Sequence, residues 1–208
     1  MTAEKDAATE GTGGAELIFR ATIEVLLEVG LKAATTRAVT AQAGVGCGLL
    51  NHYFRWPELR ARAWAEIFAH VSAHQFPPDQ PPDRALERYL STGFHSDARG
   101  YWRLWLEATD LAGSDPVMAA RLREANLAMI GGMRDCLLAG DEKGLWQVED
   151  AAGSALRISA LYDGLAGMLS AESADLSPAK AEAHLRKAVQ LELRPTRGGS
   201  AGRGSAVW

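Results

Sequence analysis

Apolar residues in most of this chain recur at the spacing of an α-helix. In the segment AELIFRATIEVLLEVG, the residues Leu17, Ile18, Ala21, Val25 and Leu26 recur three or four positions apart, which places them on one helical face. No segment alternates apolar and polar residues between hairpin turns, as a half-buried β-strand would. The sequence therefore predicts an all-α protein.

Glycine, proline and capping residues mark the ends of the predicted helices. The first helix stops at the glycine of EVG, and Thr36 is in place to N-cap a short second helix, RAVTAQA, which Gly44 closes. A third short helix is predicted over about 47–54, and Pro57 suits the first turn of a fourth, over about 57–75. After the interruption FPPDQPP, helices are expected at about 83–95, 101–113, 115–140, 149–172 and 178–193.

These helices divide into two predicted domains with a polar segment at each end. Residues 14–60 form a three-helix domain, and residues 61–193 form a larger helical bundle, with helix four connecting the two. Residues 1–13 are small, polar and glycine-containing, which is typical of a disordered arm. The tail 194–208 is rich in Gly, Ser and Arg and is expected to be flexible.

Composition excludes several classes of protein. With 22 basic and 26 acidic residues among 208, the net charge of −4 gives no nucleic-acid signal, although a whole-chain sum can hide a local basic face. Two cysteines far apart exclude a disulfide scaffold, and neither a signal peptide nor a run of about 18 apolar residues occurs. The tail motif GGSAG around Ser200 lacks the strand and helix of an esterase nucleophile. We therefore expect a cytoplasmic protein with no membrane contact and no cofactor.

The two short helices, joined through AGVG and preceded by a longer helix, form a helix-turn-helix pattern. On the third helix, Leu50 and Phe54 lie four residues apart and are suited to pack inward on the first helix. The opposite arc comprises Gly48, Leu49, Asn51 and His52. A recognition helix in the major groove of DNA needs an exposed face of this kind.

The side chains on that arc partly suit the edges of base pairs. Asn51 could pair with adenine through two hydrogen bonds, and Leu49 could contact a thymine methyl group. His52 and Tyr53 can reach either bases or phosphates. The residues placed to hold phosphates are Thr36, Arg37 and Arg55. The same pattern also fits a three-helix surface that packs Leu49 against a protein partner.

The stretch IFRATIEVLLEVGLKAATTRAVTAQAGVGCGLLNHYFRWPELRARAWAEIF resembles the N-terminal domain of TetR-family transcriptional regulators. The matching elements are EVG, the TT before helix two, AGV, Gly48 and HYF, and GLLNHYF looks closest to the BetI-type branch, whose members include repressors of choline and glycine betaine metabolism. The resemblance continues through YWRLWLEATDLAGSDPVMAARLREAN and LRISALYDGLAGML. It implies a homodimer that reads two half-sites of a palindromic operator in double-stranded DNA. The DNA-facing positions it implies are Thr36, Arg37, Cys47, Gly48, Leu49, Asn51, His52 and Tyr53.

Three positions depart from the family pattern. Gly46 stands where a serine N-cap is frequent, Leu49 replaces a small residue such as threonine, and Pro57 replaces a lysine that holds phosphate at the start of helix four. The loss of one lysine–phosphate contact would flatten the salt dependence of DNA binding by about one unit of slope per subunit. Arg55 or Arg60 could compensate for this loss.

The larger bundle is predicted to bind a small-molecule effector and to form the dimer. The resemblance implies both roles, with the last two long helices pairing across a two-fold axis. Gly164 and Gly167 would permit close approach of helices there, or are tolerated defects in a helix. The residues assigned to the effector are Phe94, Trp102, Trp105, Trp146, Tyr162 and Asp163. Aromatic faces with a carboxylate from Glu107, Asp110 or Asp163 would suit an organic cation, whereas an apolar pocket or a plain core would use the same rings.

One further pattern, on the fourth helix, is also compatible with a metal site. Glu66, His70 and His74 recur every four residues on the fourth helix and could line one face as metal ligands. A solvated helix side explains the same spacing and no fourth ligand can be named, so we predict no metal site. The predicted function is a repressor released from DNA by its effector, and not an enzyme. The alternatives are a helical enzyme, or an interaction module on the same fold that does not bind DNA.

Overall fold

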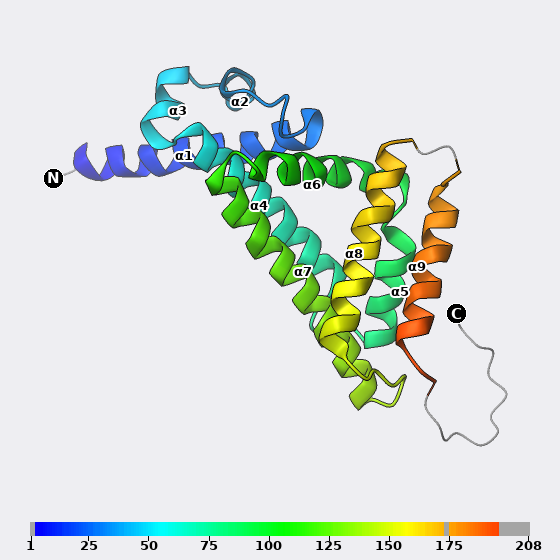
Figure 1. The fold of residues 1–208 in the computed structure, drawn as a ribbon. Helices are drawn as coiled ribbons and strands as arrows, with labels where there is room; N and C mark the ends of the chain where they lie inside the picture. The colour runs from blue at the N-terminus through cyan, green and yellow to red at the C-terminus, as the bar shows by residue number, and fades with distance from the viewer. Residues whose placement is uncertain (1–2, 173–174, 196–208) are drawn as a thin grey trace. The chain divides into compact units, whose positions relative to one another are not determined.

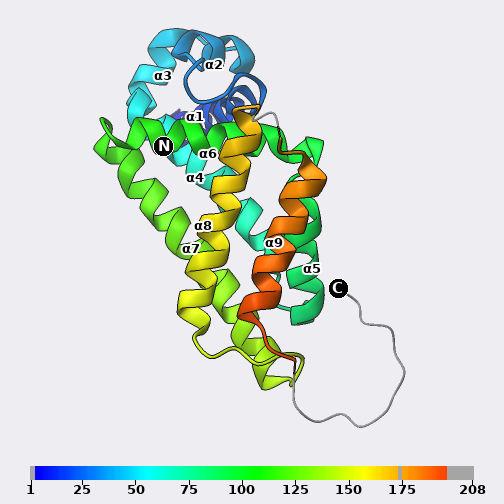
Figure 2. The ribbon, with the colours of Figure 1, turned by 45° about the vertical axis from the view of Figure 1, so that its right-hand side comes forward.

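The computed structural model describes residues 3–172 and 175–195, and for the side chains it starts at Gly13. Within these ranges the chain is helical and forms no β-strand, so the predicted all-α class is confirmed. A single antiparallel bridge joins Gln147 to Arg194. Figures 1 and 2 show the helices from two directions. Their bounds are α1 (Ala3–Val29), α2 (Thr36–Ala43), α3 (Cys47–Tyr53), α4 (Trp56–Gln75), α5 (Pro82–Thr92), η1 (Ser96–Ala98), α6 (Arg99–Ala112), α7 (Pro116–Glu142), α8 (Ala151–Ser170) and α9 (Pro178–Glu192).

The N-terminal end of the chain differs from the expectation. The structure extends α1 back to Ala3, where a disordered arm over 1–13 was expected. The segment AEKDAATE consists mainly of good helix formers, but Gly11, Gly13 and Gly14 lie between it and the packed part of α1, so local propensity alone does not explain the extension. The expected flexible tail, with Ser200, lies outside the described residues apart from its first two positions.

The chain divides into two compact units, and the first comprises Met1–His70 and Gly100–Ala125. Here α2 and α3 lie against α1, as Figure 1 shows, and α6 contacts α4 through buried aromatic rings. A single apolar core explains why these helices hold together, because each contributes fully buried side chains to it. These include Ile18, Leu26, Leu31, Val39, Leu50, Leu59, Trp64 and Leu104.

The second unit comprises Val71–Arg99 and Asn126–Trp208. In it α8 and α9 run side by side in both views, and α5 packs against α9. Two of these helices begin with side-chain caps: Asp150 accepts a hydrogen bond from the Gly153 amide at 2.9 Å, and Ser177 accepts one from the Lys180 amide at 3.3 Å. The positions of α8 (Ala151–Ser170) and α9 (Pro178–Glu192) match the helices predicted at about 149–172 and 178–193.

The division into units does not follow the predicted boundary at residue 60. The helices α4 and α7 each contribute to both units, and α6 belongs with the N-terminal helices rather than with the larger bundle. The two compact units describe contacts in the structure, so the predicted domain limits of 14–60 and 61–193 are still a prediction. No helix within the described ranges is long and apolar enough to cross a membrane.

Candidate DNA-binding surface

Capping residues fix both ends of α2, the first helix of the helix-turn-helix pattern. Thr35, and not Thr36 as predicted, caps α2: its Oγ1 accepts a hydrogen bond from the Ala38 amide at 3.1 Å. Thr35 has the extended backbone, with φ −128° and ψ 155°, that an N-cap adopts. Gly44 ends α2 in the left-handed region, at φ 66°. Thr36 is thus the first residue of α2 and half-buried, and Arg37 beside it is exposed.

One apolar side chain anchors α3 to the core. Leu50 is fully buried, and Phe54, which follows the last turn, is half-buried. Because side chains on a helix recur every 3.6 residues, burying Leu50 turns the opposite face to solvent. The structure places on this exposed face Cys47, Gly48, Leu49, Asn51 and His52, with Tyr53 half-buried and Arg55 exposed just beyond the helix.

Two of these side chains also contact α1. A methyl group built on Gly14 would lie 3.4 Å from the ring of Tyr53 and 3.6 Å from Leu49 Cδ2. The Tyr53 ring meets the His52 ring edge-on, at 4.9 Å between centroids. Leu49 and Tyr53 are therefore partly engaged by their own unit. The other exposed residues of α3 are Cys47, Gly48, Asn51 and His52.

The Cys47 side chain is turned toward α2. Its sulfur lies 3.4 Å from Oγ1 of the buried Thr40, which itself donates to the Arg37 carbonyl at 3.2 Å. Either the thiol or the hydroxyl can be the donor in the first contact. Cys47 thus helps to join α2 to α3, although the residue as a whole is exposed.

Of the two arginines expected to compensate for Pro57, one is already occupied. Arg60 Nη2 lies 3.0 Å from Asp115 Oδ2, and the two side chains are only 16% and 12% exposed. Moving such an arginine to a phosphate would leave the Asp115 charge buried without its partner, which is costly. Arg55 lies in the turn between α3 and α4 and is exposed. It is the arginine that can reach outward at this end of the surface.

The residues assigned to an effector are divided between the two units. Trp102 and Trp105 belong to the first, where Trp105 packs on Trp64 and Phe68 with centroid distances of 5.7 and 5.0 Å. Trp64 donates from Nε1 to the Leu104 carbonyl at 3.1 Å, which fixes the register of α4 against α6. Trp105 is therefore a core residue of the first unit.

The second unit contains a cluster of four aromatic rings. Tyr162 stacks on Tyr89 at 4.4 Å and lies 5.2 Å from Phe94, and Tyr89 in turn stacks on Phe76 at 5.6 Å. Burial, and then the charge of the adjacent Asp163, raise the pKa of Tyr162, so its hydroxyl stays protonated. The structure thus brings together Phe94, Tyr162 and Asp163 of the predicted set.

Gln75, Phe76 and Tyr89 were missed by the sequence reasoning. The Gln75 side chain hydrogen-bonds to Tyr162, while its Oε1 is buried with no hydrogen-bond partner. A buried amide oxygen without a partner costs about 1–3 kcal/mol, and it calls for an explanation such as a bound water, an ion or a functional role. The available signal was position, because Gln75 and Phe76 directly precede the proline run that ends α4.

Trp146 has a structural role in the α7–α8 turn. Its Nε1 donates to the Leu137 carbonyl at 2.9 Å, and its ring covers Gly140 so closely that a methyl group there would lie 1.9 Å from a ring atom. The residue is 2% exposed. Its assignment to an effector site finds no support in these contacts, since both the ring and the N–H are used within the turn.

The histidine row on α4 does not assemble into a metal site. Glu66 and His70 are exposed, and His70 Nδ1 lies 2.9 Å from the Glu66 carbonyl oxygen. The carbonyl of His74 accepts a hydrogen bond from Arg88 at 2.9 Å. Among the described residues no three His, Cys, Asp or Glu side chains are grouped to hold an ion.

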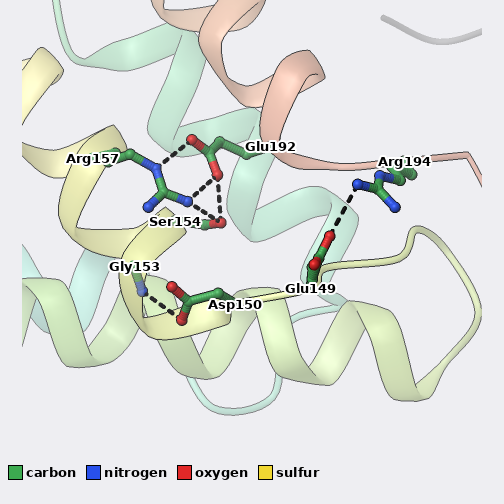
Figure 3. A network of polar contacts seen from close by, with 7 residues as sticks. All are labelled: Glu149, Asp150, Gly153, Ser154, Arg157, Glu192 and Arg194. Atoms are coloured by element: carbon green, nitrogen blue, oxygen red, sulfur yellow. Dashed lines mark hydrogen bonds and ion pairs between the residues drawn. The ribbon is translucent and has the colours of Figure 1, made fainter.

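A polar network joins the start of α8 to the end of α9 (Figure 3). Arg157 binds both oxygens of Glu192, each at 2.6 Å, and Ser154 donates to Glu192 Oε2 at 2.6 Å. These hydrogen bonds lower the pKa of Glu192 to about 2, with the Arg157 contact contributing most. Next to this network, Arg194 binds Glu149 at 2.9 Å. The two helices are thereby fixed to one another at this end.

The paired helices present an exposed stripe of small and apolar side chains. On α8 one row of exposed positions recurs every four residues, and it includes Leu156, Ala160, Gly164 and Met168, of which Leu156 and Met168 are at least half exposed. On α9 Leu191 is 74% exposed. A methyl group on Gly164 would meet nothing within 4 Å, so this side of α8 is open.

The first three helices, of which α3 is exposed along one face, followed along the chain by a longer series of helices, are the architecture of a helix-turn-helix regulator. In sequence, residues 18–55 match the family of bacterial regulatory proteins, tetR family, and residues 82–194 match the C-terminal domain of BetI-type transcriptional repressors. The chain therefore belongs to the TetR family of transcriptional regulators, in its BetI-type branch. Members of this family are DNA-binding transcription factors, which removes the alternative of a helical enzyme. No curated protein matches the sequence.

Solved structures share this fold at low sequence identity. A candidate TetR-family regulator from Rhodococcus sp. is 21% identical with a TM-score of 0.71, covering 88% of this chain and 99% of its own. A regulator from Saccharomonospora viridis in complex with choline is 15% identical with a TM-score of 0.72, covering 88% and 98%. FadR from Bacillus subtilis in complex with stearoyl-CoA is 18% identical with a TM-score of 0.64, covering 84% and 97%.

Proposed function

We propose that this protein is a cytoplasmic repressor that binds a palindromic operator as a homodimer and leaves it when a small molecule binds the second unit. The observation that carries the proposal is the exposed face of α3, held outward by the burial of Leu50. A neutral, accessible helix face of this length fits the major groove, where base edges can be read.

The structure supports different roles for the side chains at this surface. Asn51 and His52 are exposed and are assigned to base edges, Asn51 to adenine. Leu49 and Tyr53, which also touch α1, are assigned to a thymine methyl group and to the backbone. Thr36, Arg37 and Arg55 are assigned to phosphate contacts. Cys47 and Gly48 are assigned as the positions where the backbone of α3 comes close to the DNA.

The homodimer is assigned to the exposed stripe on α8 and α9. Small residues allow two helices to approach closely, and a stripe that repeats every four residues on an antiparallel pair is suited to a four-helix interface. The network around Glu192 supports this assignment because it makes the two helices one rigid surface. An interface that repeats on both subunits is what two-fold symmetry requires.

The effector is assigned to the aromatic cluster of the second unit. Phe94, Tyr162 and Asp163 of the predicted set lie there, together with the unpartnered amide oxygen of Gln75. A carboxylate beside aromatic rings suits an organic cation, and choline, which one structural relative binds, belongs to this class. Trp102, Trp105 and Trp146 are left out of this site, because Trp105 and Trp146 have core roles in the structure and Trp102 belongs to the other unit.

Release from DNA requires that effector and operator favour different conformations. Helix α4 is the element assigned to this coupling, because Gln75 at its end belongs to the aromatic cluster while Trp56 at its start follows the DNA-reading turn. A shift of α4 would alter the spacing of the two α3 helices over half-sites one helical turn apart.

The test is selection of the organism's own genomic fragments on the purified protein at about 150 mM salt, where non-specific phosphate binding is weakened. Recovery of a shared palindrome supports the proposal, and recovery of nothing above background contradicts it and favours an interaction module. Gly48→Ala is the matched variant. Nothing lies within 4 Å of a methyl group there, so the fold should be retained while operator affinity falls at least tenfold.

A further inference from the structure

The carbonyl end of α1 is held by α6. Arg103 donates from Nη2 to the carbonyls of Leu27 and Glu28, both at 3.1 Å. The last four carbonyls of a helix have no partner within it, and a cation is favoured at this end because the helix dipole is negative there. A side chain 75 residues away in sequence therefore completes the hydrogen bonding of α1.

Glu107, one turn further along α6, holds the turn that follows α1. Its Oε2 accepts hydrogen bonds from the backbone amides of Leu31 and Lys32, the latter at 3.2 Å. Between the two contacts lies Gly30, with φ at 87°, where a methyl group would come within 2.8 Å of Glu107 Oε2 and 3.0 Å of Arg103 Nε. We call Arg103 and Glu107, with the four backbone groups that they bind, the α1 clamp.

These contacts correct the expectation for two carboxylates on α6. Glu107 and Asp110 were expected beside an effector, but Glu107 belongs to the α1 clamp and Asp110 pairs with Lys32 at 2.7 Å. The other side of α6 is fixed as well, by the hydrogen bond from Trp64 to the Leu104 carbonyl and by the ring of Trp105. Helix α6 is thus attached both to α1 and to α4 within the first unit.

We propose that Arg103 and Glu107 are positioning residues for DNA reading: they fix the angle between α1 and α6 and so set the spacing of half-sites that the dimer accepts. The inference rests on the proposed function. The exposed face of α3 decides which bases are read, whereas the α1 clamp decides where the two reading helices fall along the duplex.

The geometry makes this spacing sensitive to small tilts. The α1 clamp holds the end of α1 at Gly30, and α3 contacts α1 near Gly14, which is 16 residues earlier. At about 1.5 Å per residue this lever is about 24 Å long. A tilt of about 8° at the clamp then moves the far end by about 3.4 Å, the rise of one base pair. Two polar side chains bonded to backbone on both sides of a turn restrict tilts of this size.

The test compares operators that differ only in spacing with operators that differ only in sequence. The variants are Arg103→Met and the milder Glu107→Gln, and the control is Asp110→Asn, which removes the exposed pair with Lys32 but leaves the α1 clamp intact. Affinity is measured for the selected operator, for forms with one base pair added or removed between half-sites, and for a form with one half-site base pair changed. Helicity by circular dichroism confirms folding.

Wild type and Asp110→Asn should lose at least tenfold in affinity when the spacing changes, and both clamp variants should lose less than threefold. The penalty for the changed base pair should be the same in all four proteins. Equal weakening of a clamp variant on every operator, with its spacing penalty retained, would show a merely structural role and overturn the inference. A wild type that selects no DNA would overturn the proposed function and the inference with it.

Discussion

Arg55 provides the sharpest test of the DNA surface, because it is exposed in the turn just before α4, where Pro57 stands at the position of the lysine expected from the family resemblance. Each phosphate neutralised by a protein cation contributes about 0.9 to the slope of log affinity against log salt. A homodimer has two copies of Arg55, so Arg55→Ala should flatten this slope by about 1.8. Between about 50 and 200 mM salt, a fourfold change, wild type should lose about 12-fold more affinity than the variant.

The measurement is a fluorescence anisotropy titration of the selected operator at four or more salt concentrations. Arg121→Ala is the matched control, since Arg121 is an exposed arginine of the same unit that pairs with Glu124 on α7. Its slope should equal that of wild type. Parallel lines for Arg55→Ala and wild type would refute the assignment, because a lost phosphate contact cannot leave the salt dependence unchanged.

Asp115 binds Arg60 with one oxygen and two N-terminal amides of α7 with the other, so Asp115→Ala should lower the free energy of unfolding by about 3–5 kcal/mol in urea titrations, and Asp115→Asn by less. Equal losses for the two variants would contradict this division of roles. Because the pKa of Glu192 falls from 4.5 to about 2 on folding, the stability from its pair with Arg157 is present above pH 4.5 and lost as the pH falls toward 2. Glu192→Gln should remove that part of the pH dependence in thermal melts, and an unchanged profile would count against the pair. Gly30→Ala should cost about 1–3 kcal/mol, since its φ of 87° disfavours any side chain; an unaltered melting temperature would show that the turn relaxes freely.

Much of the fold follows from local sequence. Most helices begin or end within two residues of the predicted positions, because proline, glycine and capping residues act on their immediate neighbours. Two differences from the predicted helices are clear. Thr35 and Thr36 are identical side chains, so only the backbone angle shows which of them caps α2. The start of α1 depends on how far a packed helix extends into a segment with no core of its own.

The sequence could predict the part of the candidate sites that lies on a single helix, which is the exposed face of α3. The seven residues of α3 have a single inward side chain, Leu50, and this leaves one arrangement for the others. The aromatic cluster depends instead on the packing of α4, α5 and α8, and helical spacing does not determine which faces of three helices meet. The role of Glu107 could not be predicted from local sequence, because it accepts hydrogen bonds from two backbone amides that are far away in the sequence.

The glycines of this chain differ in how freely they could be replaced during evolution. Gly93 and Gly140 lie so close to the rings of Tyr162 and Trp146 that a larger residue requires a second, simultaneous change in the ring. Gly46 and Gly48, at the start of α3, border nothing within 4 Å. A single codon change there adds a side chain to the surface and leaves the core as it was. Paralogues of this regulator could therefore diverge in the operators they recognise before their bundles diverge at all.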